Sequence, residues 1–279
     1  MLFVVGKAVH HFVLWLSREN GEIRMGNGNN RIILGVSGAS GVIISWYLAK
    51  ALKAQGLELH MVVTDAAKLT WEYEVEPFGY IPGKMPKNAD SESKASPENA
   101  IQRNICEESE AVSENAVLRN ICANCDGKAK IEMLTDLADV LYDSKDMAAA
   151  ISSGSFCTMG MIVVPCSMKT LAGIVTGYTD NLLLRAADVC LKENRRIVLC
   201  PREMPLGKVH LRNMSTAADL GCTIVPPMLS FYSGQMTVQD QIQHVVGKIL
   251  MQFGLEYEEF HPWDGCFATD QRESRKAKV

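Results

Sequence analysis

The sequence contains a turn of small residues with the composition of a phosphate-binding loop. Residues 35–41, Gly-Val-Ser-Gly-Ala-Ser-Gly, overlap the end of an apolar run at 32–36 and precede a helical pattern. At such a junction backbone N–H groups and the helix dipole point at a ligand, and small side chains let a phosphate approach. The spacing of Gly35, Gly38 and Gly41 matches neither a Walker loop nor Gly-x-Gly-x-x-Gly. The turn therefore favours a mononucleotide over a dinucleotide, although a tight turn without a ligand has the same composition.

Polar side chains follow four of the strand patterns, at the places where an open α/β sheet binds its ligands. A hydroxyl, guanidinium or carboxylate group there is positioned to hold a phosphate or to move a proton. These residues are Ser37 and Ser40, Thr64, Ser167 and Thr170, and Arg202 with Glu203. Hydroxyl groups after three of the strands favour one shared anion site over three unrelated loops.

Strand and helix patterns alternate along the chain, which predicts an α/β fold with one doubly wound parallel sheet. The runs that predict strands lie at 32–36, 57–64, 161–164, 196–199 and 223–225. The first predicted helix extends to about residue 56, and the others lie at 65–73, 131–138, 146–151, 171–175, 181–192, 210–220 and 238–253. Asp65 is expected to cap the second helix.

Composition divides the chain into one domain with appendages. Residues 31–265 are expected to form the α/β domain, residues 1–30 an N-terminal extension outside the fold, and residues 266–279 a mobile tail. Residues 77–128 are rich in Pro, Gly, Lys, Asn, Ser and Glu and poor in apolar side chains. This composition predicts a partly disordered insertion within the domain.

Charge, hydropathy and cysteine usage restrict the class of protein. The net charge of −4 argues against a general nucleic-acid binder, and no apolar run approaches the ~20 residues of a membrane span. Six of the nine cysteines are scattered without disulfide-like spacing, which indicates a reducing, cytoplasmic setting. The other three are Cys106, Cys122 and Cys125. Cys122 and Cys125 suit zinc or a dithiol, but no fourth ligand is near, so free thiols and no metal are expected.

Three further features each have two interpretations. Glu74 ends the second predicted helix, where a solvated carboxylate is the simpler interpretation. Arg185 lies three residues before Asp188, so these two side chains can form an ion pair on one helix face. The Ser-Ser-Gly-Ser run at 152–155 is either a loop of small residues or a second phosphate-binding loop.

Several motifs in order resemble the UbiX-like flavin prenyltransferases over residues 31–76 and about 130–265. They are Gly-Val-Ser-Gly-Ala-Ser-Gly (35–41), Ala-Ala-Ala-Ile-Ser-Ser-Gly-Ser-Phe (148–156), Pro-Cys-Ser-Met-Lys-Thr-Leu (165–171), Asp-Asn-Leu-Leu-Leu-Arg-Ala-Ala-Asp-Val (180–189), Leu-Lys-Glu-Asn-Arg-Arg (191–196), Pro-Arg-Glu-Met-Pro-Leu (201–206) and Phe-Tyr (231–232). Such a series is far more specific than a single glycine turn.

The resemblance implies a flavodoxin-like fold and a homo-oligomer, typically a dodecamer. It implies that the protein joins a dimethylallyl group from dimethylallyl phosphate to N5 and C6 of reduced FMN. The prenylated FMN would serve a decarboxylase of the UbiD type as its acceptor. Some relatives are named as subunits of a phenolic acid decarboxylase, although the chemistry implied is flavin prenylation.

The resemblance also implies a role for individual residues. The FMN contacts that it implies are Gly38, Ala39, Ser40, Thr64, Ser167, Thr170 and Arg185. The catalytic residues that it implies are Glu74, Lys192, Arg202, Glu203 and Tyr232. The substrate-binding residues that it implies are Ser153, Ser155, Tyr232, Lys248 and Trp263. In the family, the segment at 152–155 reaches the site of a neighbouring subunit.

These side chains suit the chemistry, because an allylic phosphate ionises to a carbocation and a departing phosphate. Cationic side chains such as Arg202 stabilise the phosphate, and an aromatic ring such as Trp263 stabilises the carbocation. The phosphate itself can take the flavin proton, with assistance from Glu203. Position 248 is usually arginine in the family, and the lysine found here does not hold phosphate bidentately. The insertion at 77–128 has no recognised counterpart.

Two other functions stay open at this point. An FMN-dependent cysteine decarboxylase needs a catalytic histidine near the first helix, and residues 41–55 contain none. An FMN-binding carrier or decarboxylase subunit would hand over its flavin without prenyl transfer. The presence of Glu74, Lys192, Glu203 and Tyr232 together favours catalysis, because FMN binding alone does not require them.

Overall fold

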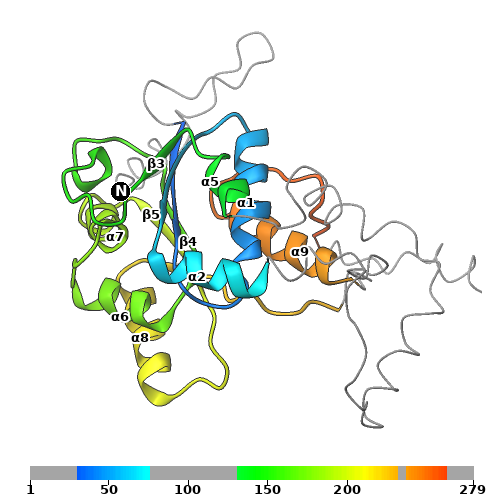
Figure 1. Ribbon diagram of the computed structural model, residues 1–279. Helices are drawn as coiled ribbons and strands as arrows, with labels where there is room; N and C mark the ends of the chain where they lie inside the picture. Colours follow the sequence, from blue (N-terminus) through cyan, green and yellow to red (C-terminus); the bar gives the residue numbers. More distant parts are fainter. Residues whose placement is uncertain (1–29, 76–130, 232–236, 263–279) are drawn as a thin grey trace, which may run out of the picture.

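The structure, a computed structural model, describes residues 30–75, 131–231 and 237–262. Six parallel strands in these ranges form one sheet in the order β3-β2-β1-β4-β5-β6, with helices on both faces (Figure 1). The doubly wound, flavodoxin-like α/β fold predicted from the sequence is confirmed. Apart from Asn30, the expected extension, insertion and tail lie outside the described residues.

All strands expected from the sequence are present, and one more completes the sheet. They are β1 (Arg31–Val36), β2 (Glu58–Val63), β3 (Val140–Tyr142), β4 (Gly160–Cys166), β5 (Arg196–Pro201) and β6 (Thr223–Ile224). β1 and β4 are buried almost throughout because helices cover both sides of the sheet. β3 is not predicted by the sequence pattern, because its three residues lie between Asp139 and Asp143 and form too short an apolar run.

The helices also follow the sequence pattern, with one exception. They are α1 (Ile43–Ala54), α2 (Asp65–Glu74), α5 (Glu132–Thr135), α6 (Met168–Thr176), α7 (Leu182–Lys192), α8 (Lys208–Asp219), α9 (Val238–Met251) and the 3₁₀-helix η2 (Ala150–Ser152). The α-helix predicted at 146–151 is wrong. The Asp143 carboxylate accepts from the Lys145 N–H, and the Asp146 carboxylate accepts from the Ala148 N–H. These local bonds favour turns over a helix.

The N-cap of α2 is Thr64 rather than Asp65. The Thr64 side-chain oxygen accepts from the Ala67 N–H at 3.2 Å, whereas Asp65 is the first helical residue and pairs with Lys68. Two adjacent residues that both favour an N-cap cannot be separated by sequence pattern alone. The bond that Thr64 accepts leaves its hydroxyl proton for another acceptor.

The helices divide into two groups that bury different faces of the sheet (Figure 1). α1, α5 and α9, with the buried side of α2, pack on one face, and α6, α7, η2 and α8 pack on the other. α1 follows β1 and packs on one face of the sheet, whereas α6 follows β4 and packs on the other. The connections from these two neighbouring strands therefore run to opposite faces at the carboxyl ends of β1 and β4. A doubly wound sheet binds its ligands at this switch point.

Three thiols are buried around strands β4, β5 and β6 of the sheet. Cys166 ends β4, Cys200 lies in β5, and Cys222 comes directly before β6. Burial raises the pKa of all three thiols, to about 11 for Cys222. They are therefore protonated at neutral pH.

The described ranges contain no group of three or more His, Cys, Asp or Glu side chains that could hold a metal ion. No helix in the same ranges is long and apolar enough to span a bilayer. Cys106, Cys122 and Cys125 lie outside the described residues.

Candidate active site

Ser37 joins the two strands at the switch point. Its buried hydroxyl donates to the Pro165 carbonyl at 2.9 Å and accepts from the Ser167 N–H at 2.8 Å. A serine hydroxyl has one proton, so this proton is already used within the protein. The expectation that Ser37 donates to a bound anion is therefore wrong, and its role is to fix β1 against β4.

Replacing Ser37 with alanine is expected to lower the free energy of unfolding by about 1–3 kcal/mol, because it leaves the half-buried Ser167 N–H without its acceptor. Ser45→Ala is the matched control. The Ser45 hydroxyl is also buried and donates to the Val42 carbonyl at 2.6 Å, but that carbonyl keeps a bond from the Ser45 N–H. Urea unfolding of both variants checks the prediction. Equal losses of unfolding free energy in the two variants would show that the Ser37 bonds between β1 and β4 add no stability beyond that of the Ser45 hydroxyl.

Gly38, Ala39 and Ser40 form the turn between β1 and α1 and are half-buried. A Cβ atom on Gly38 would lie 2.5 Å from the Ala66 Cβ and 2.9 Å from the Ala66 carbonyl carbon. Only glycine therefore lets the turn pack directly against the start of α2. The result is a narrow turn with small side chains, as an approaching phosphate requires.

Glu74 is bound to the N-terminus of α1. Its carboxylate accepts from the Gly41 N–H at 2.8 Å and from the Val42 N–H at 3.3 Å, where the helix dipole favours a negative charge. The interpretation of Glu74 as a solvated carboxylate is therefore wrong. Because these two N–H groups are occupied and the Ala39 N–H donates to the Ser37 carbonyl at 2.9 Å, an anion at this turn would use the N–H groups of Gly38 and Ser40.

Ser167 and Thr170 begin α6 beside this turn. The Ser167 hydroxyl accepts from the Thr170 N–H at 3.2 Å and donates to the Thr170 hydroxyl at 3.0 Å. Thr170 therefore has its own proton to give to a ligand. On the next strand, the Arg202 N–H donates to the Cys166 carbonyl at 3.2 Å, which places Arg202 and the exposed Glu203 at the same edge.

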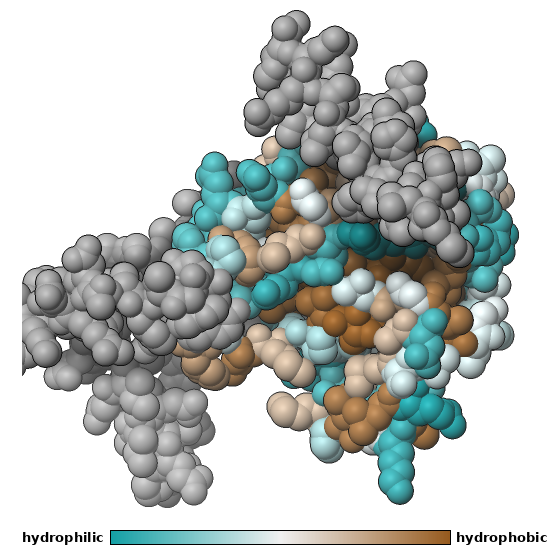
Figure 2. Space-filling view, turned by 180° about the vertical axis from the view of Figure 1, so that it is seen from behind, coloured by the Kyte–Doolittle hydropathy of each residue, from teal (hydrophilic) through white to brown (hydrophobic). Residues whose placement is uncertain are grey.

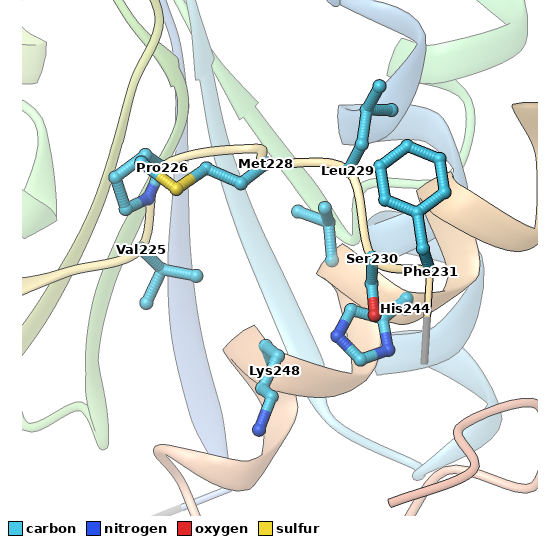
Figure 3. A pocket seen from close by; sticks show the side chains of 9 residues that line it. Val225, Pro226, Met228, Leu229, Ser230, Phe231, His244 and Lys248 are labelled. Atoms are coloured by element: carbon cyan, nitrogen blue, oxygen red, sulfur yellow. The ribbon is translucent and has the colours of Figure 1, made fainter. Parts of the chain in front are cut away.

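A cavity of about 550 Å³ lies beyond the end of β6 (Figure 3). Its polar lining comes from Ser230, His244 and Lys248, the last two being one turn apart on α9. The rest of its wall is apolar and consists of Val225, Pro226, Met228, Leu229, Phe231 and Val245. Tyr232 and Trp263, which the resemblance places near Lys248, lie outside the described residues.

Lys192, Ser153 and Ser155 lie at the opposite edge of the sheet. Lys192 ends α7 just before β5 begins, and β5 starts beside the first residue of β4. The Lys192 ammonium is 2.5 Å from the Glu193 carboxylate. The hydroxyl groups of Ser153 and Ser155 are exposed and bond each other at 2.9 Å. Within one chain these residues do not meet Arg202 or Glu203.

Arg195 holds the serine loop against the end of α7. Its guanidinium donates to the Phe156 carbonyl at 2.7 Å and also to the Gly154 carbonyl. A Cβ atom on Gly154 would lie 2.8 Å from the Lys192 Nζ, so the two segments are in direct contact. We call Ser153, Ser155, Lys192 and Arg195 the amino-edge cluster.

Arg185 lies in the first turn of α7, where the Leu182 N–H donates to the Ser144 carbonyl just beyond β3. It forms the ion pair with Asp188 at 2.7 Å that its spacing indicates, and it donates to the Ser152 carbonyl at 3.2 Å. These contacts direct Arg185 toward the loop before β4. A single chain therefore brings together the implied residues on the turn, α6 and β5, whereas the Arg185 guanidinium is bound to Asp188 and Ser152 and Lys192 lies at the amino edge.

Comparison with known proteins identifies the family. Residues 21–253 match the family model described as Flavoprotein. A probable UbiX-like flavin prenyltransferase from Sedimentibacter hydroxybenzoicus is 45% identical over 236 residues, which cover 84% of this chain and 97% of that relative. The chain belongs to the UbiX-like flavin prenyltransferases.

Solved structures of UbiX proteins agree with this assignment. A dodecameric FMN-dependent UbiX-like decarboxylase from Escherichia coli O157:H7 is 37% identical, with a TM-score of 0.63 over 84% of this chain and 100% of that one. AnUbiX (PadA1), solved in complex with FMN and dimethylallyl pyrophosphate, is 34% identical, with a TM-score of 0.62 over 85% and 98% of the two chains. The predicted family is confirmed.

Sequence reasoning about this UbiX-like chain misses three side chains that shape the site. Arg195 has no sequence signal beyond its place before a strand, and its bonds to the serine loop join segments about 40 residues apart. Ser230 and His244 have no motif around them. Only the spacing of His244 and Lys248, one helical turn apart, is available as a signal.

Proposed function

We propose that this protein is a flavin prenyltransferase that joins the dimethylallyl group of dimethylallyl phosphate to N5 and C6 of reduced FMN. The observation that carries the proposal is the match to a UbiX-like flavin prenyltransferase over 97% of that relative's length. AnUbiX, a relative of the same fold, was solved with FMN and a dimethylallyl donor, which supports both substrates.

The turn at 38–40 and the start of α6 suit the FMN phosphate. Gly38 leaves no side chain in the way, and Thr64 and Thr170 each have a hydroxyl proton to donate. Ser167 orients Thr170 through the bond between their hydroxyl groups. Reduced FMN supplies the nucleophilic ring, and the chain holds it at the edge where Arg202 and Glu203 are exposed.

In the proposed reaction the allylic C–O bond of the donor breaks and its carbon bonds to N5 of the flavin, which loses its proton. The double bond of the donor then takes up a proton, and the carbon activated in this way bonds to C6, which loses its own proton. Arg202 and Lys248 stabilise the phosphate, which leaves with the bonding electron pair. The transfer releases one proton overall. The departing phosphate takes this proton, and Glu203 assists, while Glu74 keeps the start of α1 in place beside the flavin.

The amino-edge cluster completes the site of a neighbouring subunit in this proposal. Lys192, Ser153 and Ser155 are exposed or half-exposed and meet none of the carboxyl-edge residues that the structure describes in their own chain. Exposed apolar side chains, among them Met204, Val209, Leu211 and Phe231, offer contacts to further subunits. One face of the molecule also shows hydrophobic patches between its polar regions (Figure 2). We propose a homo-oligomer, and specifically a dodecamer.

The product would pass to a decarboxylase of the UbiD type, which takes prenylated FMN as its cofactor. The two proteins would meet in the cytoplasm, which the scattered cysteines without disulfide-like spacing favour. Support for this acceptor comes from the family.

Anaerobic incubation of the protein with reduced FMN and dimethylallyl phosphate is expected to add one C5H8 unit to the flavin, detected by mass spectrometry after release. Glu203→Gln removes the carboxylate that is proposed to assist proton transfer to the phosphate, and it is expected to slow the transfer by about 10²-fold while FMN remains bound. Lys208→Gln, an exposed change at the start of α8, is the control with unchanged rate. Tight binding of FMN without any mass gain would favour a carrier or decarboxylase subunit instead.

A further inference from the structure

Three hydrogen-bond donors line the cavity beyond β6. Ser230 is 7% exposed, and its hydroxyl has no hydrogen-bond partner among the described residues. His244 is 5% exposed and packs its ring 5.2 Å from the Phe260 ring. Lys248 follows one turn later on α9. Figure 3 shows Ser230 beside His244, with Lys248 at the other end of the same cavity.

Gln241 fixes Ser230 above α9. Its side-chain oxygen accepts from the Ser230 N–H at 2.6 Å, and its amide nitrogen donates to the Ser230 carbonyl at 2.8 Å. Both backbone groups of Ser230 are therefore satisfied, and the segment before Tyr232 is tied to the first turn of the helix. The Ser230 hydroxyl remains the polar atom of this residue that a ligand in the cavity can use.

Lysine at position 248 offers a bound phosphate fewer aligned hydrogen-bond donors than an arginine would. The ammonium group is a point charge, whereas a guanidinium offers two parallel N–H groups to two phosphate oxygens. Arg202, the other cation proposed to act on the phosphate, is not among the residues that line this cavity, so a phosphate held there by Lys248 alone would keep oxygens without donors in largely apolar surroundings, which is unfavourable. Ser230 and His244 lie in the same cavity and can each donate one bond.

We propose that Ser230 and His244 bind the phosphate of the prenyl donor and supply the hydrogen bonds that Lys248 cannot supply alone. This inference rests on the proposed function. The apolar wall formed by Val225, Pro226 and Met228 then faces the dimethylallyl carbons. Ser230 and His244 become part of the phosphate site, and the Ser230 hydroxyl gains a hydrogen-bond acceptor.

The charges around His244 make this binding dependent on pH. Burial and the nearby Lys248 charge lower the pKa of His244, so the imidazole is neutral before the ligand arrives. On α9 the other charged neighbour is Asp240, whose carboxylate accepts from the Thr237 N–H in the capping box. Phe260 contributes an uncharged ring, and the wall at 225–231 has no titratable side chain.

A phosphate dianion in the cavity reverses the effect of Lys248 and raises the pKa of His244. Between the free and the bound pKa values, binding takes up a proton, so affinity falls as the pH rises through this window. The phosphate ester also titrates, and its dianion binds better at higher pH. The contribution of His244 is therefore the difference between the pH profiles of the wild type and the His244→Gln variant.

Isothermal titration of the protein loaded with oxidised FMN separates binding from reaction, because transfer needs the reduced flavin. The probes are dimethylallyl phosphate and inorganic phosphate. Ser230→Ala and His244→Gln are each expected to raise the Kd of both probes by about tenfold, and His244→Gln is expected to remove the proton uptake. Adding Lys248→Arg to His244→Gln is expected to recover most of the affinity, because the guanidinium fork replaces the lost donor.

Thr216→Ala is the matched control, since its hydroxyl donates to the Arg212 carbonyl on α8, a helix that contributes no residue to the lining of the cavity. Urea unfolding of each variant confirms that it is folded during the titration. Unchanged Kd values in both Ser230→Ala and His244→Gln would overturn this inference and leave prenyl transfer intact. Failure of the wild type to bind dimethylallyl phosphate at all would instead overturn the proposed function.

Discussion

Lys192→Ala and Arg202→Ala are each expected to lower prenyl transfer by about 10²–10³-fold, and the two inactive proteins are expected to regain activity when they assemble together. The reason is that Lys192 ends α7 at the amino edge of the sheet, whereas Arg202 follows β5 at the carboxyl edge. If each site takes its carboxyl edge from one subunit and its amino-edge cluster from another, a mixed oligomer contains some sites with both residues intact.

The amount of recovery can be stated in advance. With equal and random mixing, about one quarter of the sites receive an intact Arg202 from one chain and an intact Lys192 from its neighbour. The two variants are produced together with different affinity tags, and oligomers with both tags are assayed for C5H8 addition to FMN.

A second pair of variants is the control for this experiment. Arg202→Ala mixed with Glu203→Gln places both defects at the carboxyl edge, so every site keeps one of them. No recovery is expected from this pair. Recovery there, or its absence from the Lys192 and Arg202 pair, would contradict a site shared between subunits.

Gly38→Ala is expected to have the second largest effect, on both flavin binding and stability. The new Cβ atom would lie 2.5 Å from the Ala66 Cβ and 3.0 Å from the Ala66 carbonyl oxygen, so the turn or α2 has to move. Overpacking of this kind typically lowers the free energy of unfolding by about 1–3 kcal/mol. Because the same turn is proposed to hold the FMN phosphate, the Kd of FMN should rise by at least about tenfold.

Gly207→Ala is the matched control for this substitution. Gly207 is exposed, and the nearest atom to its added Cβ is the His210 Nδ1 at 3.8 Å, an ordinary contact. Fluorescence titration with FMN and urea unfolding of both variants test the prediction. An unchanged FMN affinity in a folded Gly38→Ala protein would place the phosphate elsewhere.

The fold could be predicted from the sequence because the strands and helices have strong local patterns. β1, β4 and α7 are examples, since each is a nearly continuous apolar run or a clear amphipathic helix. β3 has only three residues, and its place at the sheet edge depends on pairing with β2, so no local pattern reveals it. The turns at 143–148 depend on aspartate side chains that compete with helical bonds.

The site could be predicted only in part, because its geometry depends on contacts between distant segments. The Ser37 hydroxyl donates to the Pro165 carbonyl in β4, 128 residues away, and the Glu74 carboxylate accepts from the Gly41 N–H before α1, 33 residues away. Neither partner can be inferred from neighbouring residues. The separation of Lys192 from Arg202 is a property of chain direction, since α7 runs antiparallel to the strands that it connects.

The buried thiols have a consequence for a protein that handles reduced flavin in air. Reduced flavin reacts with oxygen to give peroxide, and peroxide attacks thiolates rather than thiols. Cys166 and Cys200 lie toward the edge where the flavin is proposed to bind, and burial keeps both protonated. These cysteines, close to the proposed source of the oxidant, are thus poorly able to be oxidised.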